Sequence, residues 1–313
     1  MWVLTPPKKA ITKMKLTKKL GYLCILGAGS LWGFLGLICK ILFEYGLNSP
    51  DISFYRMFMG SLFILIYLSV RDIGLLKIDR KGLLFTAVIG LISHTMANGF
   101  YFYAINQTSI TTAVILLYTA PIFTNIISRF IYDERFTPSK LFSIALCVTG
   151  VVFTATGGDI STLKFNSMGL IAGILAGFTF GLMPILNKGI VGKYNSWTIL
   201  FYSFLWGGIF LLPLAQPLKI FSIDLDLRFW CTFLFLGLFP AMLAYGLYLK
   251  GLSMGVAPSK ATIISTVEIV VAVFIACTLF NETLNIYNTL GIVMVAFASI
   301  LIQRNGPVKR VPV

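Results

Sequence analysis

Ionisable side chains are rare inside the apolar segments of this chain, and the few that occur there could bind a charged solute or move protons. Glu268 lies about midway along one such segment, close to Thr262, Ser265 and Thr266. An acid at the centre of a membrane helix costs roughly 2.5 to 3.5 kcal/mol, so it needs a partner, water or a use. We interpret Glu268 as a group that binds a proton or a cationic part of a solute. The alternative is a neutral, hydrogen-bonded glutamic acid that joins two helices.

His94 is the single histidine of the chain. Spacings of four and then three residues place it on one helical face with Asn98 and Tyr101. A histidine titrates near neutral pH and could relay or sense protons. Its alternative role is a hydrogen bond to a neighbouring helix. Glu268 and His94 are therefore the two candidates for proton coupling.

Other charged residues lie near the ends of apolar segments. Arg56 could attract an anionic group of a solute, or it could form an ion pair with Glu44 or Asp51. Glu134 and Glu282 follow apolar segments closely, which is typical of helix-end residues at a membrane surface. We predict no catalytic role for either.

Aromatic residues within the apolar segments could form the walls of a cavity for a small amphipathic solute. They could equally fill the membrane core, so the set is better evidence than any one member. With the residues above, the candidates for the cavity are Trp32, His94, Asn98, Tyr101, Tyr118, Phe180, Tyr202, Tyr245, Tyr248 and Glu268.

Sequence signatures of familiar enzymes and of metal sites do not occur. There is no Walker A motif, no GxSxG, no HExxH and no cluster of metal ligands. The five cysteines all fall in apolar segments and form no CxxC pair. We therefore predict no cofactor, no metal and no enzymatic activity.

The elements that must position these residues are membrane-spanning helices. The chain is 58% hydrophobic and 12% charged, whereas a soluble domain is about a quarter charged. Segments of about 17 to 25 apolar residues are long enough to cross a bilayer. The sequence predicts an all-α integral membrane protein with ten of them, at 21–43, 52–70, 82–104, 111–131, 138–156, 168–187, 197–215, 229–249, 260–280 and 286–303.

The basic residues indicate how these helices are oriented. The formal charge is +14, but 20 basic residues lie in the two tails and in every second connection, and 3 lie in the other connections. This is the positive-inside pattern. It predicts that the N-terminal tail, residues 1–20, and the C-terminal tail, residues 304–313, are both cytoplasmic. The partner of the basic surface is then a lipid bilayer rather than nucleic acid.

The chain also contains an internal repeat. Gly29 and Gly33 recur 148 positions later as Gly177 and Gly181, and this register, or one of 147, persists through residues 21–156 and 168–303. Each copy has five predicted helices, so the second copy enters the membrane from the opposite side. Inverted repeats of this kind allow a central site to face each side in turn. Glycines spaced by four residues favour close helix approach.

Several short motifs resemble those of the EamA-like family of the drug/metabolite transporter superfamily. They are Leu31-Trp32-Gly33 with Lys40, Ala120-Pro121 in the fourth helix, and Glu134 and Glu282 after the fourth and ninth helices. The resemblance covers about residues 20 to 303. It implies a ten-helix transporter with a central cavity lined largely by helices one to four and six to nine.

One departure from the family concerns helix breaks. The family commonly has a Glu-Pro pair in the ninth helix, where this chain has Glu268-Ile269. Proline interrupts helices, so the sequence predicts a break near Pro121 and gives no such signal near residue 269.

The sequence therefore predicts a secondary transporter of small metabolites or amino-acid-like solutes in the cell membrane. We expect an exporter that works by alternating access with proton coupling or substrate exchange, and a homodimer is left open. Two alternatives are an integral-membrane enzyme acting on lipid-linked substrates and a receptor or scaffold that does not transport. The first predicts a cluster of acids, histidines or arginines at one membrane face, and the second gives no reason for inverted repeats.

Overall fold

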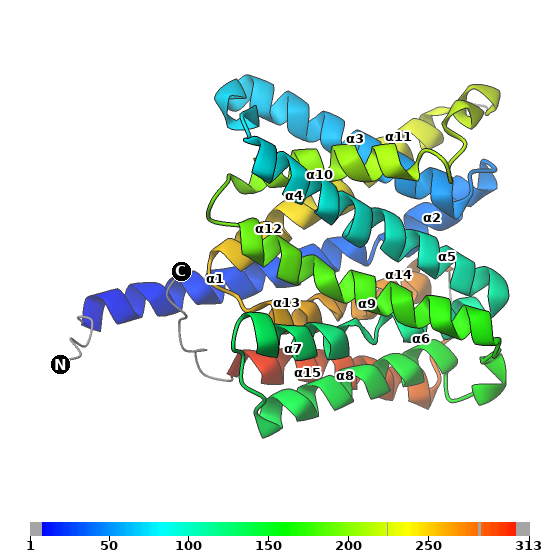
Figure 1. Ribbon diagram of the computed structural model, residues 1–313. Coiled ribbons are helices and arrows are strands. Elements are labelled where there is room, and N and C mark those ends of the chain that lie inside the picture. Colours follow the sequence, from blue (N-terminus) through cyan, green and yellow to red (C-terminus); the bar gives the residue numbers. More distant parts are fainter. Residues whose placement is uncertain (1–7, 224, 281–282, 305–313) are drawn as a thin grey trace.

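The protein folds as a bundle of helices whose axes run nearly parallel to one another (Figure 1). The computed structural model describes residues 8–223, 225–280 and 283–304. Within these residues, nine helices are long and apolar enough to cross a membrane, and Ser196–Leu211 is a shorter apolar helix of 16 residues. The chain is thus an all-α, multi-pass membrane protein, as its sequence predicts.

The helices of the first repeat are α1 (Lys8–Trp32), α2 (Leu35–Glu44), α3 (Ser49–Arg71), α4 (Arg80–Ile89), η2 (Gly90–Met96), α5 (Ala97–Gln107), α6 (Ile110–Leu117), α7 (Ala120–Ile131) and α8 (Pro138–Thr156). Those of the second are α9 (Ser167–Ile190), α10 (Ser196–Leu211), α11 (Leu227–Leu236), η5 (Gly237–Leu243), α12 (Ala244–Ser253), α13 (Pro258–Ser265), α14 (Val267–Phe280) and α15 (Ile286–Arg304). Short 3-10 turns, η1 (Ile73–Leu76), η3 (Ile160–Thr162) and η4 (Pro217–Ser222), lie in three of the connections.

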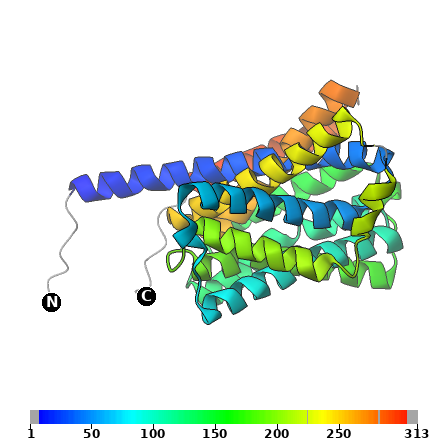
Figure 2. The same ribbon diagram turned by 90° about the horizontal axis from the view of Figure 1, so that it is seen from above.

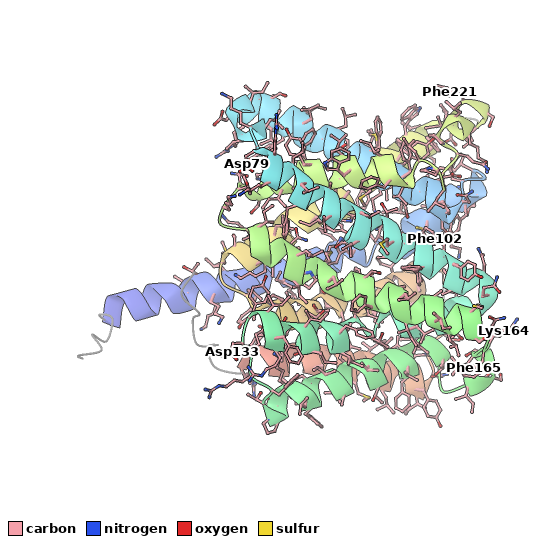
Figure 3. All side chains as sticks on the ribbon, viewed as in Figure 1. Asp79, Phe102, Asp133, Lys164, Phe165 and Phe221 are labelled. Atoms are coloured by element: carbon pink, nitrogen blue, oxygen red, sulfur yellow. The ribbon has the colours of Figure 1, made fainter. Side chains whose placement is uncertain are left out.

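The two repeats run in opposite directions. α1 begins at the end of the bundle where α15 finishes, whereas its counterpart α9 begins at the other end (Figure 1). We call the end with the start of α1 the proximal face and the other end the distal face. The first turns of α1 extend beyond the bundle on the proximal face (Figure 2). Asp79 and Asp133 lie at the proximal face, and Lys164 lies at the distal face (Figure 3).

The repeat extends to local backbone geometry. Both the third and the eighth membrane spans contain a seven-residue π-helical segment, η2 (Gly90–Met96) and η5 (Gly237–Leu243), at equivalent positions 147 residues apart. A π-helical segment widens the turn and shifts the faces of the residues that follow it, and such segments are frequent at functional sites.

Three spans are interrupted near the middle of the bundle. Short breaks separate α1 from α2, α6 from α7, and α13 from α14. The hydroxyl group of Thr119 donates to the carbonyl oxygen of Leu116, and that of Thr266 donates to Ile263, each at 2.6 Å. The break before Pro121 agrees with the sequence. The break at Thr266 forms although no proline follows it, and at both breaks a threonine hydroxyl bonds to the carbonyl oxygen three residues earlier.

Aspartates cap equivalent helices at opposite faces. Asp79 accepts a hydrogen bond from the backbone N–H of Gly82 at the start of α4, and Asp226 accepts one from Phe229 at the start of α11, both at 2.7 Å. Each also accepts a hydrogen bond from a tyrosine, Tyr194 and Tyr45 respectively. The tyrosine bond holds the pKa of each exposed aspartate below its usual value. Both helix starts are therefore tied to the neighbouring connection.

Glycines let each repeat pack directly on the broken helix of the other. A Cβ atom added to Gly29 of α1 would lie 2.6 Å from the carbonyl oxygen of Ser265, next to the break before α14. One added to Gly177 of α9 would lie 2.6 Å from the carbonyl oxygen of Leu116, next to the break before α7. Only glycine permits such an approach, so the predicted close helix contacts meet at the two breaks.

Candidate functional site: a cavity between the repeats

A cavity of about 660 Å³ lies between the two repeats. Its inner end is near the middle of the bundle, at Trp32 and Glu268. Its walls continue to Phe43, Ser49 and Ile110, which belong to helix ends at the distal face. We call it the central cavity. It is large enough for a small organic solute.

Glu268 lines the central cavity from the first turn of α14. The break at Thr266 places this carboxyl group at the amino end of a helix, where the helix dipole favours negative charge. The Tyr118 hydroxyl, next to the equivalent break in the first repeat, is within hydrogen-bonding reach of the same carboxyl. The two breaks and Glu268 thus meet at the inner end of the cavity.

Arg56 of α3 also lines the central cavity. It does not form either ion pair that the sequence suggested. Glu44 pairs with Arg228 at 2.9 Å, and Asp51 accepts hydrogen bonds from the backbone N–H groups of Asn48, at 3.0 Å, and Gln216, at 2.7 Å. The Nε atom of Arg56 is buried and has no hydrogen-bond partner among the described residues.

Seven of the ten predicted cavity residues lie in the lining. They are Trp32, Asn98, Tyr101, Tyr118, Phe180, Tyr245 and Glu268. The indole N–H of Trp32 donates to the carbonyl oxygen of Pro240 at 3.0 Å, which fixes the ring at the inner end. Its ring centroid lies 4.8 Å from that of Tyr245. Aromatic side chains from both repeats therefore form the floor of the cavity.

His94 is not among the lining residues, contrary to the sequence prediction. Its ring lies between those of Phe204, at 5.2 Å, and Tyr245, at 5.4 Å, and only 2% of the residue is exposed. The prediction assumed α-helical spacing, but residues 90–96 are π-helical. The wider turn brings Ser93 to the cavity and directs His94 to α10, where it packs on Gly207. The Nδ1 atom of His94 has no partner among the described residues.

Tyr202 and Tyr248 also lie outside the lining. The Tyr202 hydroxyl donates to the carbonyl oxygen of Leu76 at 2.8 Å, toward the proximal face. Tyr248 is fully buried behind Trp32, with ring centroids 5.3 Å apart. Both belong to the end of the bundle that the cavity does not reach, and their position along the span could not indicate this.

The structure also adds lining residues that the sequence reasoning passed over. Phe43 and Phe102 extend the aromatic wall, and Thr111 and Ser53 add hydroxyl groups. Ser53 donates to the side-chain oxygen of Asn98 at 3.3 Å.

The proximal end of the bundle is held closed beneath the cavity by a buried cluster. Glu134 accepts a hydrogen bond from the ammonium group of Lys140 at 2.8 Å and another from the hydroxyl group of Ser259. Glu134 is 2% and Lys140 5% exposed. The place of Glu134 at a helix end suggested a residue at the membrane surface. Glu134 is instead buried, and it links the first repeat to α13. Glu282 lies outside the described residues.

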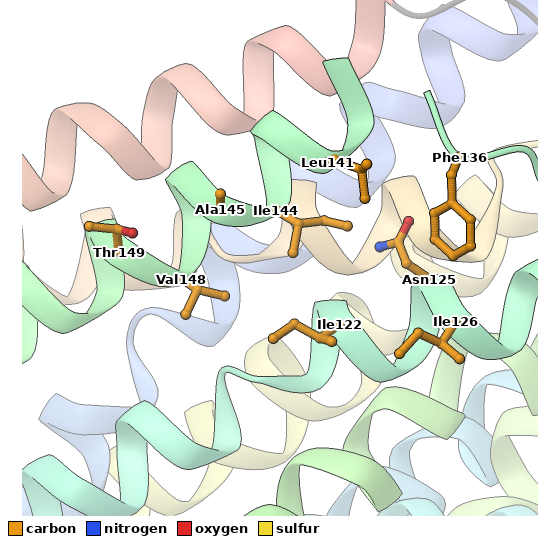
Figure 4. Close-up of a pocket in the computed structure, with 9 residues that line it drawn as sticks. All are labelled: Ile122, Asn125, Ile126, Phe136, Leu141, Ile144, Ala145, Val148 and Thr149. Carbon is orange, nitrogen blue, oxygen red and sulfur yellow. The ribbon is translucent and has the colours of Figure 1, made fainter. Parts of the chain in front are cut away.

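A second hollow of about 610 Å³ lies between α7 and α8 (Figure 4). It is lined mainly by apolar side chains such as Ile122, Ile144 and Val148, with Asn125 and Thr149 as the polar ones. It lies within the first repeat and contains no ionisable side chain, which distinguishes it from the central cavity. In the part of the chain that the structure describes, no three His, Cys, Asp or Glu side chains gather as a metal centre requires.

Comparison with known proteins agrees with this architecture. A sequence model of the EamA-like transporter family matches residues 19–156 and, separately, residues 167–304. A solved crystal structure superposes with a TM-score of 0.74 at 15% identity and covers 92% of this chain and 96% of its own. That likeness is one of fold.

Two relatives illustrate the range of names in this group. A protein named an uncharacterized transporter from Archaeoglobus fulgidus is 28% identical over 268 residues, which are 86% of this chain and 91% of the relative. A protein named an S-adenosylmethionine uptake transporter from Rickettsia conorii is 28% identical over 244 residues, which are 75% of this chain and 76% of the relative.

Proposed function

Because this chain belongs to the EamA-like transporter family, we propose that it is a secondary transporter that moves a small organic solute across the cell membrane by alternating access. The observation that carries the proposal is the central cavity. It lies between two inverted repeats and reaches the distal face. Toward the proximal face it is closed by the buried cluster of Glu134, Lys140 and Ser259. A rearrangement of the two repeats would open the same site to the other side.

The lining supports a small metabolite or an amino-acid-like solute. Aromatic rings of Trp32, Tyr101 and Phe180 provide apolar contact, and Ser53 and Asn98 provide hydrogen bonds. A mixture of apolar walls and a few polar groups is typical of sites for small organic molecules. In this proposal the solute moves without covalent change, so the protein is not an enzyme, and it needs no cofactor and no nucleic acid.

Glu268 is the proposed coupling residue. It lies at the inner end of the cavity, where a proton or a cationic group of the solute can reach it. His94 lies behind the wall, so it would have to pass protons through neighbours rather than touch the solute. We propose exchange of the solute against protons, or against a second solute, with Glu268 as the shared site.

The proposed orientation places the proximal face in the cytoplasm, because the basic connections, the start of α1 and the end of α15 lie there. The structure then corresponds to a state open to the outside. The proposed direction is export. Since gradients set the direction of a secondary transporter, an assay needs solute on each side in turn. The Rickettsia relative is named an uptake transporter.

The experiment is flux through purified protein in lipid vesicles. Candidate solutes come from comparing metabolites inside and outside cells with and without the protein. We expect solute flux that responds to an imposed pH gradient or to solute on the opposite side, and we expect Glu268→Gln to abolish the response to pH.

Two results would separate the parts of this proposal. Flux that ignores the pH gradient, together with a fully active Glu268→Gln variant, would remove the coupling role of this residue. An absence of flux for every solute that differs between the two cell lines would remove the transport proposal itself and favour a receptor or scaffold.

A further inference from the structure

The central cavity contains one basic and one acidic side chain, and they come from different repeats. Among the described lining residues, the only Asp, Glu, Lys, Arg or His side chains are Arg56 of the first repeat and Glu268 of the second. Their repeat counterparts are Ser203 and Ala120, which carry no charge. The cavity therefore departs from the repeat symmetry at two positions, with groups of opposite sign.

Among the described residues, neither of these two side chains forms an ion pair with another residue of the protein. The four ion pairs among the described residues join Arg129 to Asp133, Lys140 to Glu134, Lys193 to Asp79 and Arg228 to Glu44. Neither Arg56 nor Glu268 takes part in any of them. The buried Nε atom of Arg56 has no hydrogen-bond partner in the part of the chain that the structure describes, and a buried charged donor without an acceptor is costly.

A solute can supply what each group lacks. A guanidinium binds a carboxylate or a phosphate through paired hydrogen bonds. A carboxylate at the amino end of a helix binds an ammonium group. A solute with a single anionic group would leave Glu268 without a cation, and one with a single cationic group would leave Arg56 without an anion.

We propose that the central cavity binds a zwitterion, with its anionic group on Arg56, its ammonium group on Glu268 and its apolar part against Trp32 and Phe180. This rests on the proposed transport function and narrows its substrate to compounds such as α-amino acids. It also explains the proposed exchange of solute against protons, because a proton and the ammonium group of the solute compete for the carboxyl group of Glu268. Arg56 is then the residue that tells a zwitterion from a simple amine.

The test compares three matched series on the purified protein. The probes are the L-α-amino acids, their amides, which retain the ammonium group only, and their N-acetyl derivatives, which retain the carboxylate only. Binding is measured by competition and by thermal stabilisation. We expect the best-bound amino acid to exceed both of its derivatives by about ten- to a hundredfold in affinity, the scale of one lost charged hydrogen bond.

Variants assign each charge to its residue. Arg56→Gln should weaken amino-acid binding by a similar factor and leave amide binding unchanged, so that the two become equal. Glu268→Gln should weaken both of these and leave N-acetyl binding unchanged. Arg56→Lys should recover part of the loss, which a damaged fold would not. Arg228→Gln, which removes an exposed arginine at the same face, is the control and should bind as the parent does.

The inference fails if a singly charged series binds as well as the amino acids, or if no amino acid binds. It also fails if Arg56→Gln weakens the amide and the amino acid equally, since the arginine would then act through the fold. In each of these cases, flux of another solute through the vesicles would keep the transport function intact. The two proposals can therefore fail separately.

Discussion

The contact between Gly29 and the break in the ninth span gives a quantitative prediction. In Gly29→Ala the new methyl carbon would lie 2.6 Å from the carbonyl oxygen of Ser265 and 2.8 Å from Val267 Cγ1, whereas ordinary contacts begin at 3.4 Å. The first contact is thus about 0.8 Å too short, and it is with backbone, which yields little. Overpacking of this kind costs about 1 to 3 kcal/mol. Replacing glycine by alanine within a helix recovers roughly 1 kcal/mol.

A matched variant separates these two contributions. Gly27 belongs to the same helix, and its added methyl carbon would meet only the flexible end of Leu247, at 3.4 Å. Both variants gain the same helix propensity, so their difference in stability is the overpacking cost alone, about 1 to 3 kcal/mol. The measurement is the shift in unfolding of the detergent-solubilised protein, compared between the two variants.

Solute binding provides a second measurement on the same pair. Moving α1 away from Ser265 also displaces the break that positions Glu268, so Gly29→Ala should bind solute more weakly than Gly27→Ala. Gly177→Ala, whose methyl carbon would lie 2.6 Å from the carbonyl oxygen of Leu116, should lose a similar amount of stability. Equal stability of Gly29→Ala and Gly27→Ala would refute the close packing of α1 on this break.

Three further outcomes are expected. Lys140→Met leaves Glu134 buried without its ion-pair partner, so the melting temperature should fall by an amount equivalent to about 3 to 5 kcal/mol; an unchanged melting temperature would contradict burial of this pair. The Tyr45 hydroxyl keeps the pKa of Asp226 low, so the stability it adds is present above the ordinary carboxyl pKa and lost as pH falls below it. Tyr45→Phe should therefore move the onset of acid-induced melting to higher pH, and an unmoved onset would argue against this bond. A cysteine at Lys164 should react with an impermeant thiol reagent outside intact cells, and labelling only after lysis would reverse the proposed orientation.

The arrangement of the spans could be predicted from the sequence because long apolar segments carry a strong signal. Nine of the ten predicted segments correspond to helices that meet the length of a membrane span, and the tenth corresponds to Ser196–Leu211. The glycine spacing indicated close helix contacts in the same way. It did not indicate which helices would meet, since that depends on packing between residues far apart in the chain, Gly29 with Ser265 and Gly177 with Leu116.

The geometry inside the spans was harder to predict. His94 and Ser93 are adjacent, and which of them faces the cavity depends on a π-helical segment that has no clear signature in a single sequence. At the break near Thr266 a threonine hydroxyl bonds to the preceding turn, but Thr86 makes the same bond inside the unbroken helix α4, so a threonine does not predict a break. Arg56 was noticed for its charge, but only the positions of Glu44 and Asp51 leave it without an ion pair.

Two kinds of asymmetry between the repeats have different consequences. Tyr101 lines the cavity while its counterpart Tyr248 is buried behind Trp32, a difference between two residues of the same type that comes from the conformation. Glu268 and its counterpart Ala120 differ in the sequence itself. Under the proposed mechanism, a change of state exchanges the surroundings of the two tyrosines and leaves the charges where they are. The conformation therefore decides which side of the membrane the cavity reaches, and the residues that break the symmetry decide what it binds on either side.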